Sequence, residues 1–100
     1  MNITNLPPEF KGTGEVDGFT FKLVHTSNKA LIYEVTIEES THYEIFERKT
    51  VPLCVDFANR IYSETDFKEV YPKAKDFGVW AWTYNKFKDV LVKLGEINHA

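Results

Sequence analysis

The side chains in this chain that can do nucleophilic or acid–base chemistry are three histidines and one cysteine: His25, His42, His99 and Cys54. A thiolate beside a histidine can act as a nucleophile activated by its base. The segment around the cysteine, residues 51–55, is apolar and typical of a buried strand, so we expect Cys54 to lie in the core. The sequence contains no serine-hydrolase, zinc-protease, phosphate-loop or dinucleotide motif. We therefore assign no catalytic residue.

The acidic side chains offer a second chemistry, either a carboxylate pair or a magnesium site. Residues 63–66, Ser-Glu-Thr-Asp, have the composition of a metal loop but lack the regular ligand spacing of a calcium loop. A lone cysteine forms neither an internal disulfide nor a CxxC zinc site. We interpret residues 63–66 as a solvated turn and predict no metal and no cofactor. The alternative, a small enzyme with an unrecognised carboxylate or histidine site, stays open.

Residues 31–47 carry five acidic side chains and neither lysine nor arginine. In the strand register predicted below, Glu34, Glu38 and Glu44 share one face of neighbouring strands. A patch of one sign can steer a basic partner toward the protein. The alternative is an ordinary solvated sheet face with basic residues nearby.

The densest aromatic stretch is residues 77–85, which contains both tryptophans. Strand alternation would put Trp80, Trp82 and Tyr84 on one face and smaller apolar residues on the other. A strand that is apolar on both faces must be covered on both sides, so we expect it to lie centrally in the fold or between the fold and a partner. We predict that Trp80, Trp82 and Tyr84 bind a protein partner, with Glu34, Glu38 and Glu44 steering it. The alternative is that these aromatic rings belong to the core.

Three strands with alternating apolar residues are expected over about residues 18–26, 29–38 and 42–49. Pairing Leu23 with Leu31 and Phe21 with Tyr33 puts the apolar residues of the first two strands on one face. This register leaves the loop 26–28, in which Asn28 would adopt the left-handed conformation.

The third strand pairs with the second in a register that sets Ile37 against Tyr43 and Val35 against Ile45. The three strands then form a meander. Phe46 falls on the more solvated face of this meander, which is an anomaly for so large an apolar side chain.

The C-terminal segment predicts a helix over about residues 86–95, with Asn85 as the N-cap and Gly95 just past its end. Its apolar stripe has helical spacing and consists of Phe87, Val90, Leu91 and Leu94. We expect the stripe to dock on the sheet face that carries the apolar residues of the first two strands. One longer helix over residues 76–94 is the alternative. Residues 50–76 are interpreted as one short strand plus loop.

The bulk composition narrows the classes of function. One hundred residues, of which 43% are hydrophobic, suit one domain over residues 1–100 with a real core. A formal charge of −3 argues against nucleic acid as the main partner, because phosphate binding normally needs a basic stripe. The apolar runs are too short to span a bilayer, and the first residues lack the pattern of a signal peptide. We expect a small cytoplasmic protein.

Residues 42–49, Tyr71-Pro72 and residues 76–84 together resemble small uncharacterised proteins encoded by bacteriophages and other mobile elements of bacteria. The resemblance covers about half of the chain. Its motifs are a Tyr-Glu strand and an aromatic strand leading into a helix. It implies a small cytoplasmic accessory protein, and it carries no catalytic or cofactor residue over to this chain.

The fold predicted is α+β, a mainly antiparallel sheet of four to five strands that begins with an N-terminal meander and has the C-terminal helix packed on one face. The function predicted is a non-enzymatic binding or accessory module that acts through a protein–protein surface. Its partner is a host or other protein, and a homodimer is a further option. The alternatives are the small enzyme and an accessory protein that binds nucleic acid.

Overall fold

The computed structural model describes residues 2–99, apart from the side chain at position 15. The chain divides into two compact units. Unit 1 comprises Met1–Leu6 and Arg48–Tyr71, and unit 2 comprises Pro7–Glu47 and Pro72–Ala100. A compact unit is not by itself an independently folding domain, so one domain over residues 1–100 stays a prediction.

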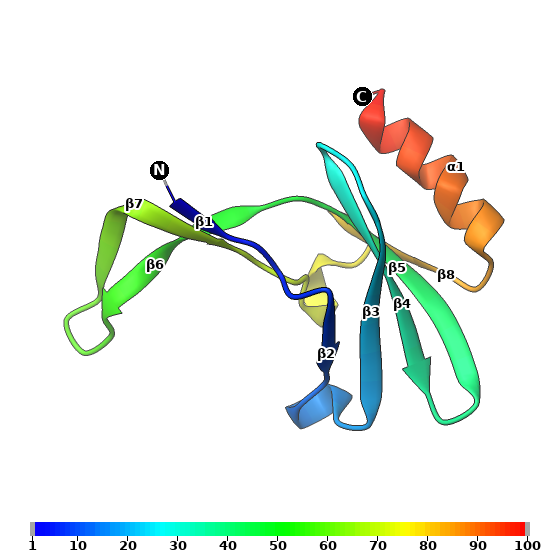
Figure 1. The fold of residues 1–100 in the computed structure, drawn as a ribbon, viewed down its shortest axis with the longest axis horizontal. Helices are drawn as coiled ribbons and strands as arrows, with labels where there is room; N and C mark the ends of the chain where they lie inside the picture. The colour runs from blue at the N-terminus through cyan, green and yellow to red at the C-terminus, as the bar shows by residue number, and fades with distance from the viewer. Residues whose placement is uncertain (1, 100) are drawn as a thin grey trace. The chain divides into compact units, whose positions relative to one another are not determined.

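Unit 2 is a five-stranded antiparallel sheet with one helix packed against it (Figure 1). The sheet order is β2-β3-β4-β5-β8, and two short 3₁₀ turns, Gly14–Val16 and Ala74–Asp76, lie outside it. The strands are β2 (Glu9–Lys11), β3 (Phe19–Thr26), β4 (Ala30–Ile37), β5 (Ser40–Glu47) and β8 (Ala81–Tyr84), and the helix is α1 (Phe87–Asn98). The predicted α+β class, with a mainly antiparallel sheet and a C-terminal helix, is confirmed at this level.

The β3–β4 pair has the predicted shared face but a different pairing. Phe21 lies opposite Val35 and Leu23 opposite Tyr33, two positions away from the predicted partners. The register shifts between Leu23 and His25, where β3 has one residue more than β4. Asn28 is not left-handed, so that part of the prediction is wrong.

The β4–β5 pair overturns the predicted register. Leu31 lies opposite Phe46 and Ile32 opposite Ile45, because β4 and β5 are joined by a tight turn at residues 38–39. Glu38 takes a left-handed φ of 53° in this turn. The pairing differs from the predicted one by an odd number of residues, so every side chain of β5 lies on the opposite face. Phe46 is thereby buried, with its ring stacked on that of Tyr33 at 5.9 Å.

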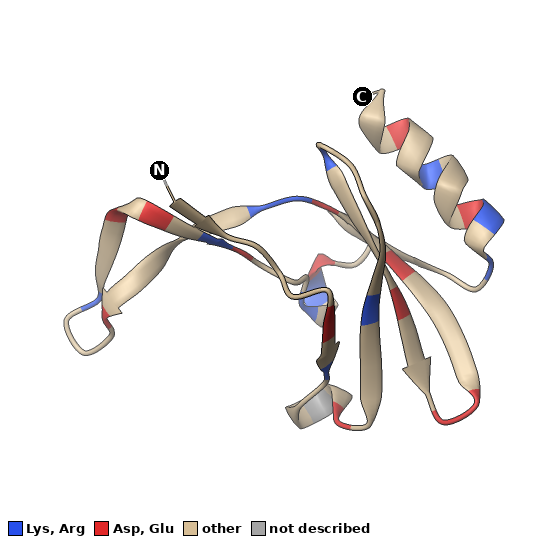
Figure 2. Cartoon of the chain, in the orientation of Figure 1, with Lys and Arg blue, Asp and Glu red and all other residues tan. Residues whose placement is uncertain are grey.

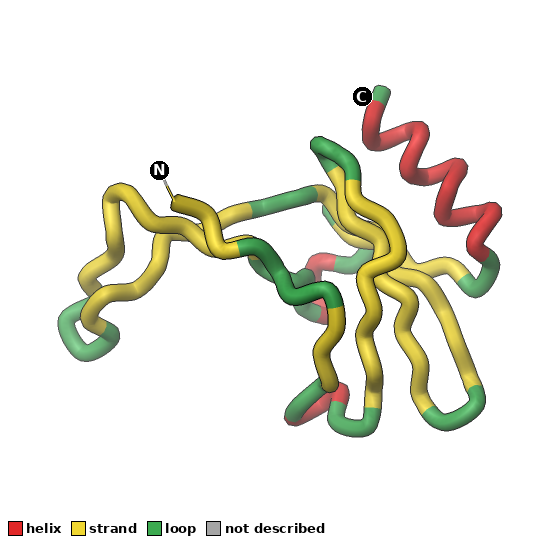
Figure 3. Tube along the Cα trace, viewed as in Figure 1, coloured by secondary structure: helices red, strands yellow, loops and turns green. Residues whose placement is uncertain are grey.

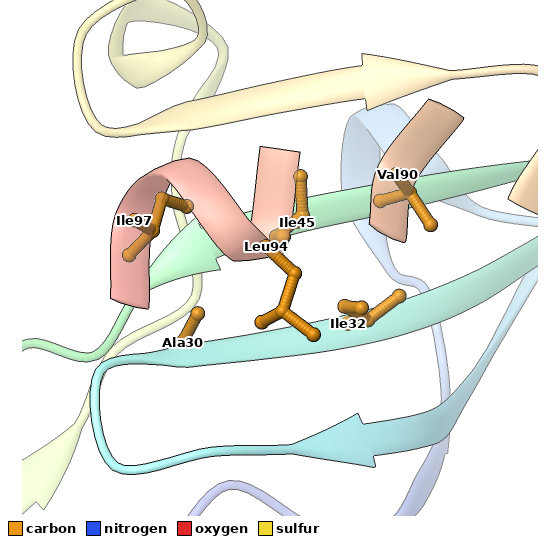
Figure 4. Packing of buried hydrophobic residues seen from close by; sticks show 6 residues of the cluster. All are labelled: Ala30, Ile32, Ile45, Val90, Leu94 and Ile97. Carbon is orange, nitrogen blue, oxygen red and sulfur yellow. The ribbon is translucent and has the colours of Figure 1, made fainter. Parts of the chain in front are cut away.

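The core of unit 2 consequently lies on both faces of β4. On one face the helix packs on the two central strands, and Figure 4 shows its side chains pointing toward theirs. This cluster consists of Ala30, Ile32, Ile45, Val90, Leu94 and Ile97. The other face carries the buried side chains Phe21, Leu31, Tyr33, Val35 and Phe46.

The prediction that the helix docks on the sheet face of Phe21 and Tyr33 is therefore wrong. That face is filled by aromatic rings instead: Phe10 stacks on Phe21 at 4.6 Å, and Trp80 meets Phe46 edge-on at 6.1 Å. Because β4 is apolar on both faces, the pattern of this strand alone does not say which face receives the helix.

Helix α1 begins one residue later and ends three residues later than predicted. Its N-cap residue is Lys86 rather than Asn85, and Gly95 lies inside it rather than beyond its end. The extension brings Ile97 onto the sheet, which offsets a glycine cost of about 1 kcal/mol. Leu91 is 43% exposed, so it does not belong to the docked stripe. Residues 81–84 form strand β8, so the single long helix over 76–94 is not formed.

Unit 1 is a three-stranded sheet in the order β1-β7-β6. Its strands are β1 (Asn2–Thr4), β6 (Thr50–Asp56) and β7 (Ile61–Glu69), with β1 parallel and β6 antiparallel to β7. Figure 3 shows strand and loop but no helix in these segments. The interpretation of residues 50–76 as one short strand plus loop is wrong, because polar side chains in β7 conceal its extended conformation from a hydrophobic pattern.

Candidate protein-binding surface

The aromatic stretch lies at an edge of the five-stranded sheet rather than at its centre. Strand β8 pairs with β5 alone and begins only at Ala81. Before it, Gly78 has a φ of 90°, and the N–H groups of Val79 and Trp80 both donate to the carbonyl of Asp76. This turn breaks the strand alternation on which the prediction of a central strand rested.

The three predicted aromatic binding residues do not share one face. Trp82 and Tyr84 pack against the core cluster beneath the helix, and Lys93 places its Nζ 3.9 Å from the centre of the Trp82 ring. Trp80 packs on Phe46, whose side chain lies on the opposite face of the sheet. All three rings are partly buried. Their role in binding a partner stays a prediction, and their common surface does not exist.

The predicted acidic patch is divided in the same way. Glu34 lies opposite Tyr43 on the helix side of the sheet and beside Lys22 of β3, whereas Glu44 lies opposite Tyr33 on the other side. Glu38 is exposed in the turn between β4 and β5. The odd register separates these side chains, so the prediction of one shared acidic face is wrong. Their role in steering a partner stays a prediction.

Of the histidines, His42 has a carboxylate partner. Its Nε2 lies 2.9 Å from Oε2 of Glu44, two residues along the same strand, and both side chains are partly buried. A carboxylate at this distance orients an imidazole and is one part of an acid–base site. His25 and His99 are exposed. Cys54 is also exposed, in β6, so its predicted place in the core is wrong.

The sequence did not reveal the most unusual property of the molecule, which is that unit 1 has no apolar core. Every buried hydrophobic side chain in the described part of the chain belongs to unit 2. Among residues 2–6 and 48–71 one residue is buried, and it is the acid Glu69. The large apolar side chains of unit 1 are instead exposed; Ile3, Val51, Val55, Phe57, Ile61 and Tyr62 are called the exposed apolar set below.

These exposed residues come from all three strands and from both faces of the sheet. Ile3, Phe67 and Pro52 form one row across β1, β7 and β6, since each is paired with the next. Val51 is paired with Lys68 and therefore lies on the opposite face. Farther along, the register shifts twice between Pro52 and Asp56, and Figure 1 shows β7 bending in this region. The apolar content of residues 51–57 was visible in the sequence, but it indicated burial.

The buried acid of unit 1 joins the ends of its separate chain segments. The carboxylate of Glu69 accepts a hydrogen bond at Oε1 from the backbone N–H of Leu6, 3.1 Å away, and at Oε2 from Nε of Arg48, 2.8 Å away. Leu6 is the last residue before the chain enters unit 2, and Arg48 is the first after it returns. Both bonds involve the charged carboxylate: the first ties Leu6 to β7, and the second ties Arg48 to β7.

The tip of the β6–β7 hairpin presents Phe57, whose side chain is 89% exposed. The turn is held by Asp56, which accepts hydrogen bonds from the side-chain amide of Asn59 at 2.8 Å and from its backbone N–H at 3.3 Å. These bonds, the side-chain one first, lower the pKa of the Asp56 carboxyl from its ordinary value. Arg60 completes the turn with a left-handed φ of 55°.

No protein-family model, curated protein or solved structure matches this chain. Among the described residues, no three His, Cys, Asp or Glu side chains gather as a metal site would require. Helix α1 is too short to cross a membrane, and no other helix in the described part of the chain is long and apolar enough.

Proposed function

We propose that the protein is a non-enzymatic binding module and that its binding surface is the three-stranded sheet of unit 1. The observation that supports this proposal is the absence of any buried apolar side chain among the described residues of that unit. Three strands need a covered hydrophobic face to be stable in water. A partner that covers the exposed apolar set supplies that burial.

The energetic reason is the area that a partner removes from water. Burial of apolar surface contributes roughly 25 cal/mol per Å². Phe57 at the hairpin tip and Tyr62 in β7 are exposed aromatic side chains, and such rings are typical of the anchors that dominate binding energy. Apart from Ile3, the exposed apolar set lies within residues 51–62, in the β6–β7 hairpin.

The setting proposed for this module is the bacterial cytoplasm, as an accessory protein of bacteriophage or mobile-element type. The support is the resemblance of residues 42–49, 71–72 and 76–84 to such proteins. Unit 2 carries an excess of acidic side chains, which favours basic partners and disfavours nucleic acid.

The experiment that tests this function compares two serine variants of equal exposure. Val55 in unit 1 is 64% exposed and Val92 in unit 2 is 66% exposed, so Val55→Ser and Val92→Ser remove matched amounts of accessible apolar surface. Immobilised parent and Val92→Ser proteins are expected to retain the same stoichiometric partner, another protein or the chain itself, and Val55→Ser is expected to lose it. Equal retention by all three proteins contradicts the proposal.

A second candidate function is favoured by one observation, the His42–Glu44 pair. If the protein is an enzyme, the imidazole of His42 is the side chain expected to transfer the proton, and the rate should depend on it. His42→Gln should abolish that activity while leaving partner binding through unit 1 unchanged. A rate unaffected by His42→Gln would remove this candidate.

A further inference from the structure

We infer that residues 53–65, the outer part of the β6–β7 hairpin, unfold locally in the free protein while unit 2 stays folded, and become ordered when a partner binds. These residues are called the outer hairpin below. The local unfolding rests on the contacts within unit 1 alone, and its coupling to binding rests on the proposed function. Binding then has to supply the free energy that orders the hairpin, which regulates the affinity of this surface.

The first argument is that the outer hairpin lacks a third strand. Strand β1 pairs with β7 at Asp66, Phe67 and Lys68 and does not reach farther toward the hairpin tip. Residues 61–65 of β7 therefore have only β6 beside them in the sheet. An isolated two-stranded hairpin is at best marginally stable in water, whereas three strands with a covered apolar face can be stable.

The second argument is the exposure of the side chains. No residue of the outer hairpin is buried, and its large apolar side chains Val55, Phe57, Ile61 and Tyr62 are between 50% and 89% exposed. Ile61 and Tyr62 are consecutive residues of a strand, so their side chains lie on opposite faces and do not cover each other. Burial of apolar surface, the dominant favourable term in folding, is therefore small in this segment.

The third argument is that the pairing of β6 with β7 is interrupted where the outer hairpin begins. Pro52 is paired with Phe67, but the next pair is Cys54 with Tyr62, so one residue of β6 faces four of β7. Within these four residues, Oγ of Ser63 accepts two backbone N–H groups of its own strand, at 3.2 and 2.9 Å. Such local bonds compete with bonds across the ladder. The outer hairpin is thus weakly connected to the rest of the sheet.

Surface charge does not compensate for the missing burial. Figure 2 shows charged side chains of both signs along β6 and β7, and those of the outer hairpin are Asp56, Arg60 and Glu64. Arg60 and Glu64 are exposed, and exposed ion pairs contribute little to stability. Asp56 accepts its hydrogen bonds from Asn59, so these bonds shape the turn and do not hold one strand against the other.

The rest of the molecule is held more firmly. The inner part of unit 1 has all three strands, and the buried carboxylate of Glu69 bonds to both Leu6 and Arg48. In unit 2, strand β4 has buried side chains on both faces. Opening the outer hairpin therefore breaks few contacts, whereas opening β4 exposes a whole core. Segments that differ in this way open with different free energies.

Amide hydrogen exchange of the free chain tests the local unfolding. The amides that join β6 to β7 in the outer hairpin are expected to exchange within about 100-fold of the rate in an unfolded chain. Those of β4 should be slowed by about 10³-fold or more.

Ile45→Val is the control for independent opening, because it removes one methylene group from the core of unit 2. Exchange in β4 should accelerate about two- to tenfold, and exchange in the outer hairpin should not change. Equal protection of the outer hairpin and β4 in the parent overturns the inference. So does an outer hairpin whose exchange accelerates together with that of β4.

A disulfide across the hairpin provides a second comparison within one variant. Tyr62 is paired with Cys54, and the Cα atoms of paired residues in antiparallel strands are about 4.5–5.5 Å apart, within the range of a disulfide. Cys54 is the sole cysteine of the chain, so in Tyr62→Cys the new thiol has one partner within the chain. Oxidation of the monomeric variant should slow exchange in the outer hairpin about tenfold or more relative to its reduced form. Unchanged exchange after oxidation, verified by mass, contradicts opening by separation of the strands.

The same two forms test the coupling to binding, with the protein retained by the immobilised parent as the probe. Both forms lack the ring of Tyr62, so a difference between them reports order rather than contact. The oxidised form should bind the probe about tenfold more tightly, because its hairpin is already ordered. Equal affinity of the two forms overturns the coupling.

The outcomes separate this inference from the proposed function. Fast exchange in the outer hairpin, together with a retained protein that does not depend on Val55, keeps the local unfolding and overturns both the proposed binding surface and the coupling. Slow exchange in the outer hairpin, together with a protein lost by Val55→Ser, keeps the binding module and overturns the inference.

Discussion

Arg48 donates from Nε to Oε2 of Glu69 across 2.8 Å, and Glu69 is the buried acid of a unit whose apolar side chains are exposed. The side chain of Glu69 is 4% exposed, and its other oxygen accepts the N–H of Leu6. In the described part of unit 1, one acid is buried while large apolar side chains are exposed. Polar contacts hold the segments of unit 1 together, and its apolar surface is available for binding.

Replacing Glu69 with alanine should loosen residues 1–6, which keep their pairing with β7 through β1. The change removes the carboxylate that accepts the N–H of Leu6 and the Nε–H of Arg48. Amide hydrogen exchange at Ile3 and Thr4, in β1, is the measurement, and it should accelerate strongly.

Glu64→Ala on the same strand is the control, because Glu64 is exposed. It should leave exchange in β1 unchanged. Slow exchange at Ile3 in the Glu69→Ala protein would show that the carboxylate does not hold this segment.

Leu94→Ala should destabilise unit 2 by about 2–5 kcal/mol. Leu94 is 8% exposed and packs from the helix against Ile32 and Ile45 of the sheet, so its truncation leaves a cavity. Urea unfolding followed by circular dichroism measures the loss. Leu91→Ala is the matched control on the same helix: it is half-exposed and should cost under about 1 kcal/mol. Equal costs for the two variants would contradict the observed docking face.

Phe46→Ala should cost about 3–5 kcal/mol, since the ring is fully buried and contacts those of Tyr33 and Trp80. Tryptophan fluorescence should shift to longer wavelength as the environment of Trp80 becomes more solvated. Phe57→Ala removes an equally large ring from the exposed hairpin tip and should leave the urea midpoint of unit 2 unchanged. A Phe46→Ala protein as stable as the parent would indicate that β5 has the predicted register, with Val35 opposite Ile45.

Acid should loosen the tip of the β6–β7 hairpin. The hydrogen bonds from Asn59 lower the pKa of Asp56 below its ordinary value of 3.8, so the folded turn favours the ionised carboxylate. The stabilisation is complete above pH 3.8 and disappears as the pH falls through the lowered pKa of the folded state. The NMR shift of the Asn59 side-chain amide, followed against pH, should titrate with a midpoint under 3.8 and lose this transition in Asp56→Asn. A midpoint above 3.8 would contradict the hydrogen bonds at this turn.

Local sequence patterns determined much of the fold of unit 2. Alternation of apolar residues predicted β3, β4 and β5, and the spacing of Val90 and Leu94 predicted an amphipathic helix near the C-terminus. These signals are local, because the period of the side chains within one element does not depend on what the element contacts. The α+β class and the absence of a recognised catalytic motif followed from the same residues.

The tertiary structure alone decided which faces meet. A two-residue turn at Glu38 and Glu39 set an odd register between β4 and β5, which moved Phe46 into the core and separated Glu34 from Glu44. A turn at Gly78 likewise placed Trp80 and Trp82 on opposite faces. In unit 1, the apolar composition of residues 51–62 is that of buried strands, yet the chain leaves them exposed. Composition states how apolar a segment is, whereas its exposure depends on whether another part of the structure covers it.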